Sequence, residues 1–193
     1  MAILVAGLVL FLGVHLVPAF PARREALLAR WGRPRYRLAF SAVAGVGLVL
    51  IVVGYGAARQ EPVLLWVPPV WTRHVAALLT LVAIVLLVAA YVPRNHLKLR
   101  LRHPMVLGVK VWAFAHLVSN QMLADVVLFG SFLVWAVLDF RAARARDRAA
   151  GVAAAGPASA GATVIAVVVG IVVWAAIAFW AHGAYIGVKP FGR

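Results

Sequence analysis

The chain has 193 residues, of which 65% are hydrophobic and only 12% are charged. A soluble domain is about 45–50% apolar and about 25% charged, so this composition indicates an integral membrane protein. The formal net charge of +14 would favour nucleic-acid binding in a soluble chain, but here the basic residues lie between apolar segments, where they set topology and meet membrane lipid, and we exclude a nucleic-acid partner.

Six apolar segments predict an all-α integral membrane fold, a six-helix transmembrane bundle. The first segment has no basic region before it and ends in prolines rather than in a small-residue cleavage site, so we interpret it as a retained span and not as a signal peptide. The second carries four glycines, which let neighbouring helices approach closely. These are Gly45, Gly47, Gly54 and Gly56. Within a single transmembrane domain, residues 1–193, we expect spans at about 2–20, 38–58, 74–92, 105–119, 124–140 and 163–182.

Spans four and five are short. Residues 105–140 number 36, fewer than two full crossings at roughly 20 residues each. We therefore expect these two spans to form a short hairpin with its turn at residues 119–125. A stretch rich in Ala, Gly, Pro and Ser, residues 149–162, is predicted to be a flexible linker.

Basic residues alternate from connector to connector. The connectors after spans one, three and five carry six, four and four Lys or Arg residues, whereas those after spans two and four carry two and none and the tail carries two. By the positive-inside rule the basic connectors are cytoplasmic, which gives six spans with both termini on the non-cytoplasmic side. Neither a soluble domain nor a fixed-period repeat is evident.

The fourth span, within RHPMVLGVKVWAFAHLVSN, carries an unusual set of polar groups. Pro104 favours a helix start here, because the N–H that proline lacks has no partner in a first helical turn. At about 100° per residue, one face then carries Trp112, His116, Ser119 and Asn120. An ionisable side chain at membrane depth costs about 2.5–3.5 kcal/mol, which favours a functional role for His116.

Two of the six histidines, His15 and His116, lie inside predicted spans, and we interpret them as metal ligands. The chain has no cysteine, so ligation falls to other side chains. Two neutral imidazoles from different helices are a usual means of holding a haem iron in a bundle. Non-haem iron or zinc would prefer a carboxylate or a third imidazole, and the nearby acids Asp125 and Asp139 are expected at helix ends. Among haem, non-haem iron and zinc, we therefore expect haem to be the cofactor.

The other four histidines lie outside the spans or at their ends. His74 and His96 are expected to be solvated connector residues. His103, beside Arg102 at a helix start, is either a capping and headgroup-contacting residue or part of an anion site. We expect Arg102 and His103 to bind an anionic group, a haem propionate or a lipid phosphate. His182, at the end of the last span, is a reserve metal ligand.

Four blocks of the sequence carry a resemblance. They are FLGVHLVP, the basic connector leading into RYRLAFSAVAGVGL, RHPMVLGVKVWAFAHLVSN, and FWAHGAYIG. Over most of its length the chain resembles the NnrU family of bacterial membrane proteins, related to the plant and cyanobacterial 15-cis-zeta-carotene isomerase. The resemblance implies a haem b protein of the bacterial inner membrane whose two ligands fall on His15 and His116. The isomerase's alternative cysteine ligand falls on Ala113, so that ligand exchange is not available here.

The same resemblance implies redox or isomerase chemistry on an apolar polyene, or a role in the nitric oxide metabolism of denitrifying bacteria. A second resemblance links RHPMVLG to the RHPxYxG motif of isoprenylcysteine carboxyl methyltransferases and phospholipid methyltransferases, where the Arg-His pair helps hold S-adenosylmethionine. Here Leu107 replaces the aromatic residue, and no acid follows Asp147. A methyltransferase is thus one alternative, and a non-enzymatic protein that senses or delivers haem or nitric oxide is another.

The depths of the two histidines in the membrane bear on their pairing. At about 1.5 Å per residue, His15 lies roughly 7 Å and His116 roughly 16 Å inside the cytoplasmic ends of their spans. Ligands of one iron share a depth. Either span one extends past Pro18, or Lys110 snorkels from deeper in the membrane, or another residue such as His182 takes the place of one ligand.

The topology is testable because the chain has no cysteine of its own. Ala150→Cys is expected to resist an impermeant thiol reagent added to intact cells, since residue 150 lies within the basic, cytoplasmic connector after span five. Labelling of this cysteine from outside the cell would contradict the predicted orientation.

Overall fold

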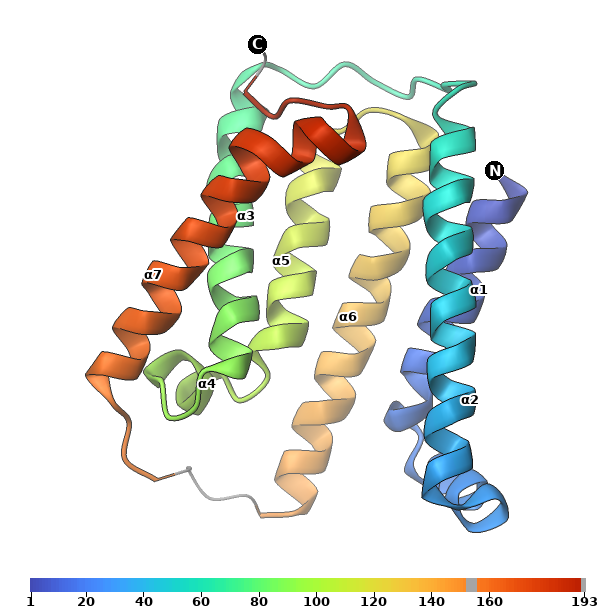
Figure 1. The fold of residues 1–193 in the computed structure, drawn as a ribbon, viewed down its shortest axis with the longest axis vertical. Coiled ribbons are helices and arrows are strands. Elements are labelled where there is room, and N and C mark those ends of the chain that lie inside the picture. The colour runs from blue at the N-terminus through green and yellow to red at the C-terminus, as the bar shows by residue number, and fades with distance from the viewer. Residues whose placement is uncertain (152–155, 192–193) are drawn as a thin grey trace. The chain divides into compact units, whose positions relative to one another are not determined.

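The computed structural model describes residues 1–151 and 156–191, and in these residues it is built of helices (Figure 1). Their bounds are α1 Ala2–Leu16, η1 Val17–Ala19, α2 Pro21–Ala58, α3 Trp71–Tyr91, α4 His96–Leu101, α5 Pro104–Ser119, α6 Leu123–Ala149, α7 Ala160–Ala176 and η2 Ile177–Ile186. Here η1 is a 3-10 turn and η2 a π-helix. An isolated antiparallel bridge joins Leu64 to Met122.

Five helical stretches are long and apolar enough to cross a membrane. They are Ala2–Ala19, Pro21–Ala58, Trp71–Tyr91, Leu123–Ala149 and Ala160–Ile186. The apolar helix α5 is shorter, with 16 residues. The predicted all-α membrane fold is therefore confirmed at the level of five to six apolar helices. The count of six spans and the hairpin of spans four and five stay predictions.

The basic connector after the first span is largely helical. Helix α2 begins at Pro21, well before the expected start of span two, and is interrupted at Gly32, whose backbone has φ 71° and ψ 163°. That conformation is essentially restricted to glycine. Two residues later Pro34 supplies no N–H and its ring excludes a continuous helix, so two helical segments meet at this kink.

The ends of α6 and α7 also differ from the expected bounds. Helix α6 continues past residue 140 to Ala149, because the Ala- and Arg-rich sequence that follows the apolar part is made of strong helix formers. Helix α7 begins at Ala160, where the Ser159 hydroxyl caps it by accepting a hydrogen bond from the Ala162 N–H at 3.2 Å. Of the predicted linker 149–162, residues 152–155 lie outside the described residues.

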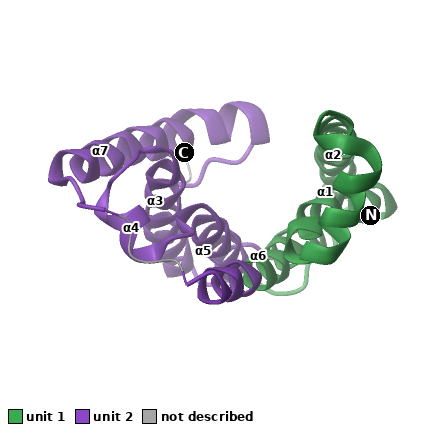
Figure 2. Ribbon diagram, turned by 90° about the horizontal axis from the view of Figure 1, so that it is seen from below, with its two compact units in different colours: residues 1–67, 121–139 green, residues 68–120, 140–193 purple. Residues whose placement is uncertain are grey.

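The chain divides into two compact units, coloured separately in Figure 2. The first comprises residues 1–67 and 121–139, and the second residues 68–120 and 140–193. The prediction of a single transmembrane domain stays a prediction.

In the first unit, α1 packs against α2 at glycines. A Cβ atom on Gly47 would lie 2.7 Å from the Phe11 nitrogen, and one on Gly54 would lie 2.7 Å from the Leu4 Cα. A Cβ on Gly7 would lie 2.6 Å from the Ile51 nitrogen. The two backbones therefore approach as closely as glycine allows, as is usual where membrane helices associate.

In the second unit, α3 packs against both α5 and α7. A Cβ on Gly108 of α5 would lie 2.9 Å from the Ala83 carbonyl oxygen, and one on Gly170 of α7 would lie 2.8 Å from the Val85 Cα. The Trp174 indole N–H donates to the Thr80 hydroxyl at 3.1 Å, which ties α7 to α3 by a polar contact. Helix α3 is thus the element on which α5 and its histidine are positioned.

The glycine contacts predict which substitutions the fold tolerates. Gly47→Ala and Gly54→Ala are each expected to lower the free energy of unfolding by about 1–3 kcal/mol, because the added methyl group meets backbone atoms of α1. Gly45→Ala and Gly56→Ala are the matched controls in the same helix. Nothing lies within 4 Å of their Cβ positions, so these variants should not lower the free energy of unfolding and should raise it by up to about 1 kcal/mol, because alanine has the higher helix propensity. Equal effects in all four variants, measured by denaturant unfolding in detergent, would contradict this packing.

Candidate functional site

His15 occupies an aromatic environment in the first unit. It is the second-to-last residue of α1 and is half-buried. The centroid of its ring lies 4.4 Å from that of Phe11, 5.1 Å from that of Phe40 and 6.2 Å from that of Trp135. Its Nδ1–H donates to the Phe11 carbonyl oxygen at 2.6 Å. The neighbouring Trp135 Nε1 is buried and has no hydrogen-bond partner among the described residues. Three aromatic rings and one unpaired donor therefore surround this imidazole.

His116 lies in the last turn of α5, in the second unit. Its Nδ1–H donates to the Trp112 carbonyl oxygen at 2.8 Å, and the two rings lie 5.1 Å apart. The predicted common face of Trp112 and His116 is therefore present. Lys110, on the same helix, places its ammonium nitrogen 5.5 Å from the Phe140 ring centroid, and its snorkelling stays a prediction.

The ends of the first and last spans are relevant to the depths at which His15 and His182 lie in the membrane. The α-helix of span one ends at Leu16, and the helical path continues only as the 3-10 turn to Ala19. His182, the reserve ligand, lies in the π-helix Ile177–Ile186, is hydrogen bonded through Nδ1 to the Val188 carbonyl oxygen at 2.6 Å, and belongs to the second unit.

His74 and His96 have different surroundings. His74 is exposed at the start of α3, as expected for a solvated residue. His96, expected to be solvated as well, instead begins α4 and is half-buried. Its ring Nδ1 lies 2.8 Å from the Thr163 hydroxyl, which also accepts a hydrogen bond from the His96 N–H, so His96 joins α4 to α7.

Arg102 and His103, the predicted anion-binding pair, share one carboxylate. His103 Nε2 lies 2.9 Å and Arg102 Nη1 3.5 Å from the same oxygen of Asp147, near the end of α6. The anionic group beside Arg102 and His103 in this structure is thus the Asp147 carboxylate. The expectation of a haem propionate or lipid phosphate at Arg102 and His103 stays a prediction.

Local backbone structure sets the position of Arg102. Asn95 is fully buried and caps α4: its Oδ1 accepts from the Lys98 N–H at 2.8 Å, and its Nδ2 donates to the Ala89 carbonyl oxygen at 2.8 Å. Helix α4 ends at Leu101, and the next residue, Arg102, has a φ of 63°, which is uncommon for a residue with a side chain. Such a conformation costs about 1–3 kcal/mol and persists where surrounding contacts hold it. The Asp147 carboxylate is one such contact.

The electrostatics of this cluster favour an ionised Asp147. Desolvation raises the pKa of Asp147, but the hydrogen bond and charge of His103 and the Arg102 guanidinium outweigh it, and the net pKa lies below its ordinary value. Asp147 lies beyond the apolar part of α6, among arginines. Its negative charge is therefore held by groups from the start of α5.

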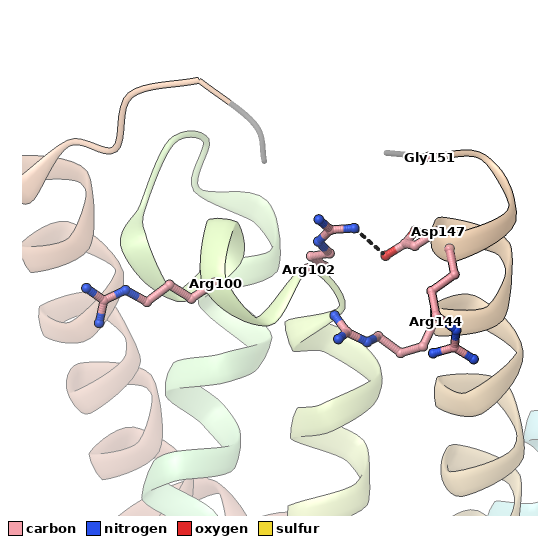
Figure 3. Close-up of a pocket in the computed structure, with 6 residues that line it drawn as sticks. Arg100, Arg102, Arg144, Asp147 and Gly151 are labelled. Atoms are coloured by element: carbon pink, nitrogen blue, oxygen red, sulfur yellow. Dashed lines mark ion pairs between the residues drawn. The ribbon is translucent and has the colours of Figure 1, made fainter. Parts of the chain in front are cut away.

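A hollow of about 460 Å³ opens beside this pair, in the second unit (Figure 3). We call it the arginine hollow. It is lined by Arg100, Arg102, Arg144, Asp147, Arg148 and Gly151. In Figure 3 the Arg102 guanidinium faces Asp147, whereas Arg100 extends away from that ion pair. Four guanidinium groups and one carboxylate line this space.

Sequence reasoning missed one polar pair in the first unit. The Tyr55 hydroxyl donates to Asp125 Oδ1 at 2.6 Å, and Asp125 Oδ2 accepts from the Met122 N–H at 3.1 Å. Asp125 is 5% exposed and lies in the first turn of α6, where a carboxylate is favourable. Asp125 is conspicuous in the sequence as an acid within an apolar stretch, but nothing local identifies Tyr55 as its partner.

The described residues contain no cluster of three or more His, Cys, Asp or Glu side chains able to hold a metal ion. Long apolar helices, few charges and basic helix ends define a helical membrane protein. More particularly, the chain belongs to the NnrU family: the family model described as NnrU protein matches residues 3–190, nearly the whole chain. No curated protein and no solved structure matches the chain. The family resemblance of the four sequence blocks is therefore confirmed.

The Asp147 cluster makes stability depend on pH. Because the folded-state pKa of Asp147 is lowered, its contribution is complete above its unfolded-state pKa and is lost as the pH falls through the folded-state value. Asp147→Asn is expected to lower the Tm at neutral pH by a few degrees and to reduce the fall in Tm on acidification. Glu25→Gln, which changes an exposed acid, is the control and should retain the wild-type acid dependence. Parallel Tm curves for wild type and Asp147→Asn would exclude this role.

Proposed function

We propose that this NnrU-family chain is an integral membrane haem b protein in which His15 and His116 would hold the haem iron. The observation that carries the proposal is the geometry shared by these two histidines. Each donates its Nδ1–H to the carbonyl oxygen four residues earlier, Phe11 for one and Trp112 for the other. Metal-ligating histidines commonly fix the ring in this way, which leaves the Nε2 lone pair to the metal.

The residues around each imidazole fit an apolar, planar cofactor. Rings of Phe11, Phe40 and Trp135 contact His15, and the Trp112 ring contacts His116. Aromatic faces are suitable neighbours for a porphyrin, and the unpaired Trp135 N–H is a donor suited to a polar group of a bound molecule. Each imidazole is oriented by its own helix before any cofactor binds.

A haem held by two imidazoles supplies one-electron redox chemistry. The protein's own residues would orient the imidazole rings of His15 and His116 and keep the proton on Nδ1. The long apolar helices would surround the site with apolar side chains and exclude water. Substrates that partition into such surroundings are uncharged. We therefore propose an apolar polyene, in an isomerisation of the 15-cis-zeta-carotene type, or nitric oxide as the molecule acted upon, and the bacterial inner membrane as the location.

The alternative of an S-adenosylmethionine-dependent methyltransferase depends on Arg102 and His103. Both contact Asp147, and the pair joins the start of α5 to the end of α6. This arrangement favours a role in positioning these helix ends and adds no support to the methyltransferase.

Single histidine variants test the ligand assignment. His15→Ala and His116→Ala are each expected to lose the six-coordinate low-spin absorption spectrum of the haem-loaded protein, because each removes one axial nitrogen and no cysteine replaces it. His74→Ala, which changes an exposed histidine, is the control and should keep the wild-type spectrum. His182→Ala tests the reserve ligand in the same series.

Ligand loss is separated from unfolding by small-molecule rescue. In His15→Gly and His116→Gly, added imidazole is expected to restore the low-spin spectrum, because it occupies the position of the missing side chain. If all of the histidine variants keep the wild-type spectrum, or the wild type takes up no haem when haem is supplied, the proposal fails and the methyltransferase becomes the better account.

A further inference from the structure

We propose that the arginine hollow binds the phosphate group of an anionic phospholipid. This inference concerns a site separate from His15 and His116 and does not depend on haem binding. The hollow is formed within the second unit by Arg100 and Arg102, at the end of α4, and by Arg144, Asp147 and Arg148, near the end of α6. It combines enough space for a phosphate group with four arginine side chains in its lining.

The charges around the hollow are unbalanced. Asp147 contributes one negative charge and is already shared by Arg102 and His103. Arg100, Arg144 and Arg148 form no ion pair with a carboxylate within residues 1–151 and 156–191. Guanidinium groups gathered around one space repel one another, and a phosphate would relieve this repulsion while accepting several charge-assisted hydrogen bonds. The hollow is therefore suited to an anion with several acceptor oxygens.

A second hollow favours a lipid over a free phosphate. It is lined by Phe140, Arg141, Ala142, Arg144, Ala145 and Arg148, so it shares two arginines with the arginine hollow and adds apolar side chains. Along α6 the apolar part of the span precedes the arginines. Phe140 lies one helical turn before Arg144 and two turns before Arg148, about 6 and 12 Å along the axis. A molecule with a phosphate at the arginines and acyl chains beside Phe140 matches this order.

The predicted topology places the same residues at a membrane surface. The connectors that contribute the arginines are two of the three basic ones, which the positive-inside rule assigns to the cytoplasmic face. Anionic lipids act at that face, and clusters of arginine directly after a membrane span are their usual binding sites. The proposed occupant is therefore an anionic phospholipid of the surrounding bilayer, recognised through its phosphate.

Lipid binding to the full-length, detergent-purified and delipidated protein tests the proposal. Phosphatidylglycerol is titrated and bound lipid is counted by native mass spectrometry. Arg144→Gln and Arg148→Gln are each expected to weaken its apparent affinity about fivefold, and the double variant about thirtyfold. Arg146→Gln is the matched control: it removes one positive charge from the same helix but lines neither hollow, and it should retain wild-type affinity. Arg144 is half-buried and Arg148 exposed, so these variants should fold.

Phosphatidylcholine and inorganic phosphate are tested as two further ligands, to distinguish an anionic lipid from a zwitterionic lipid and from free phosphate. Phosphatidylcholine is expected to bind at least fivefold more weakly than phosphatidylglycerol, and inorganic phosphate at the same concentration should not displace the lipid. The proposal is overturned if Arg144→Gln and Arg148→Gln bind phosphatidylglycerol as tightly as Arg146→Gln does. Equal binding of phosphatidylcholine, or displacement of the lipid by inorganic phosphate, would likewise overturn the assignment to an anionic lipid.

Discussion

Helix backbones approach closely at glycine in both units, and this packing joins α1 to α2 and both α5 and α7 to α3. Lipid tails surround leucine and valine as favourably as a protein core does, so membrane helices associate through close van der Waals packing rather than through a hydrophobic driving force. In the first unit Gly47 and Gly54 bring α2 onto α1. In the second, Gly108 and Gly170 bring α5 and α7 onto α3. These contacts position α1, which carries His15, and α5, which carries His116.

Polar groups are then accommodated locally, each by a partner that needs no water. His15 and His116 each donate a hydrogen bond from Nδ1–H to a carbonyl oxygen of their own helix. This bond satisfies Nδ1 and leaves Nε2 available to a ligand. Charged groups gather beyond the apolar part of α6, where Asp147 holds Arg102 and further arginines face a shared hollow. In consequence the apolar helices supply oriented imidazoles, whereas the basic helix ends supply positive charge around the arginine hollow.

Much of the helical arrangement could be predicted from the sequence, because hydropathy and helix-end signals are local. The apolar spans and the start of α5 at Pro104 followed from composition and from the chemistry of proline. The break at Gly32 was missed, since a basic stretch gives no hydropathy signal, although Gly32 and Pro34 together are a recognisable interruption. Asp147 could not be assigned as the partner of Arg102 and His103, because 44 residues separate His103 from Asp147 and periodicity carries no information at that range. The proposed pairing of His15 with His116 rests on the hydrogen bond of each ring to its own helix and on the family resemblance. The spacing of the two residues in the sequence does not indicate it.

We propose that His15 and His116 ligate one haem b. Low-temperature electron paramagnetic resonance of the purified, haem-loaded ferric protein tests it most directly, because the signal reports the spin state and the two axial ligands of the iron together. We expect a low-spin signal of the kind given by two imidazoles, at one haem per chain. A high-spin signal, a low-spin signal typical of a different ligand pair, or protein that retains no haem would contradict it.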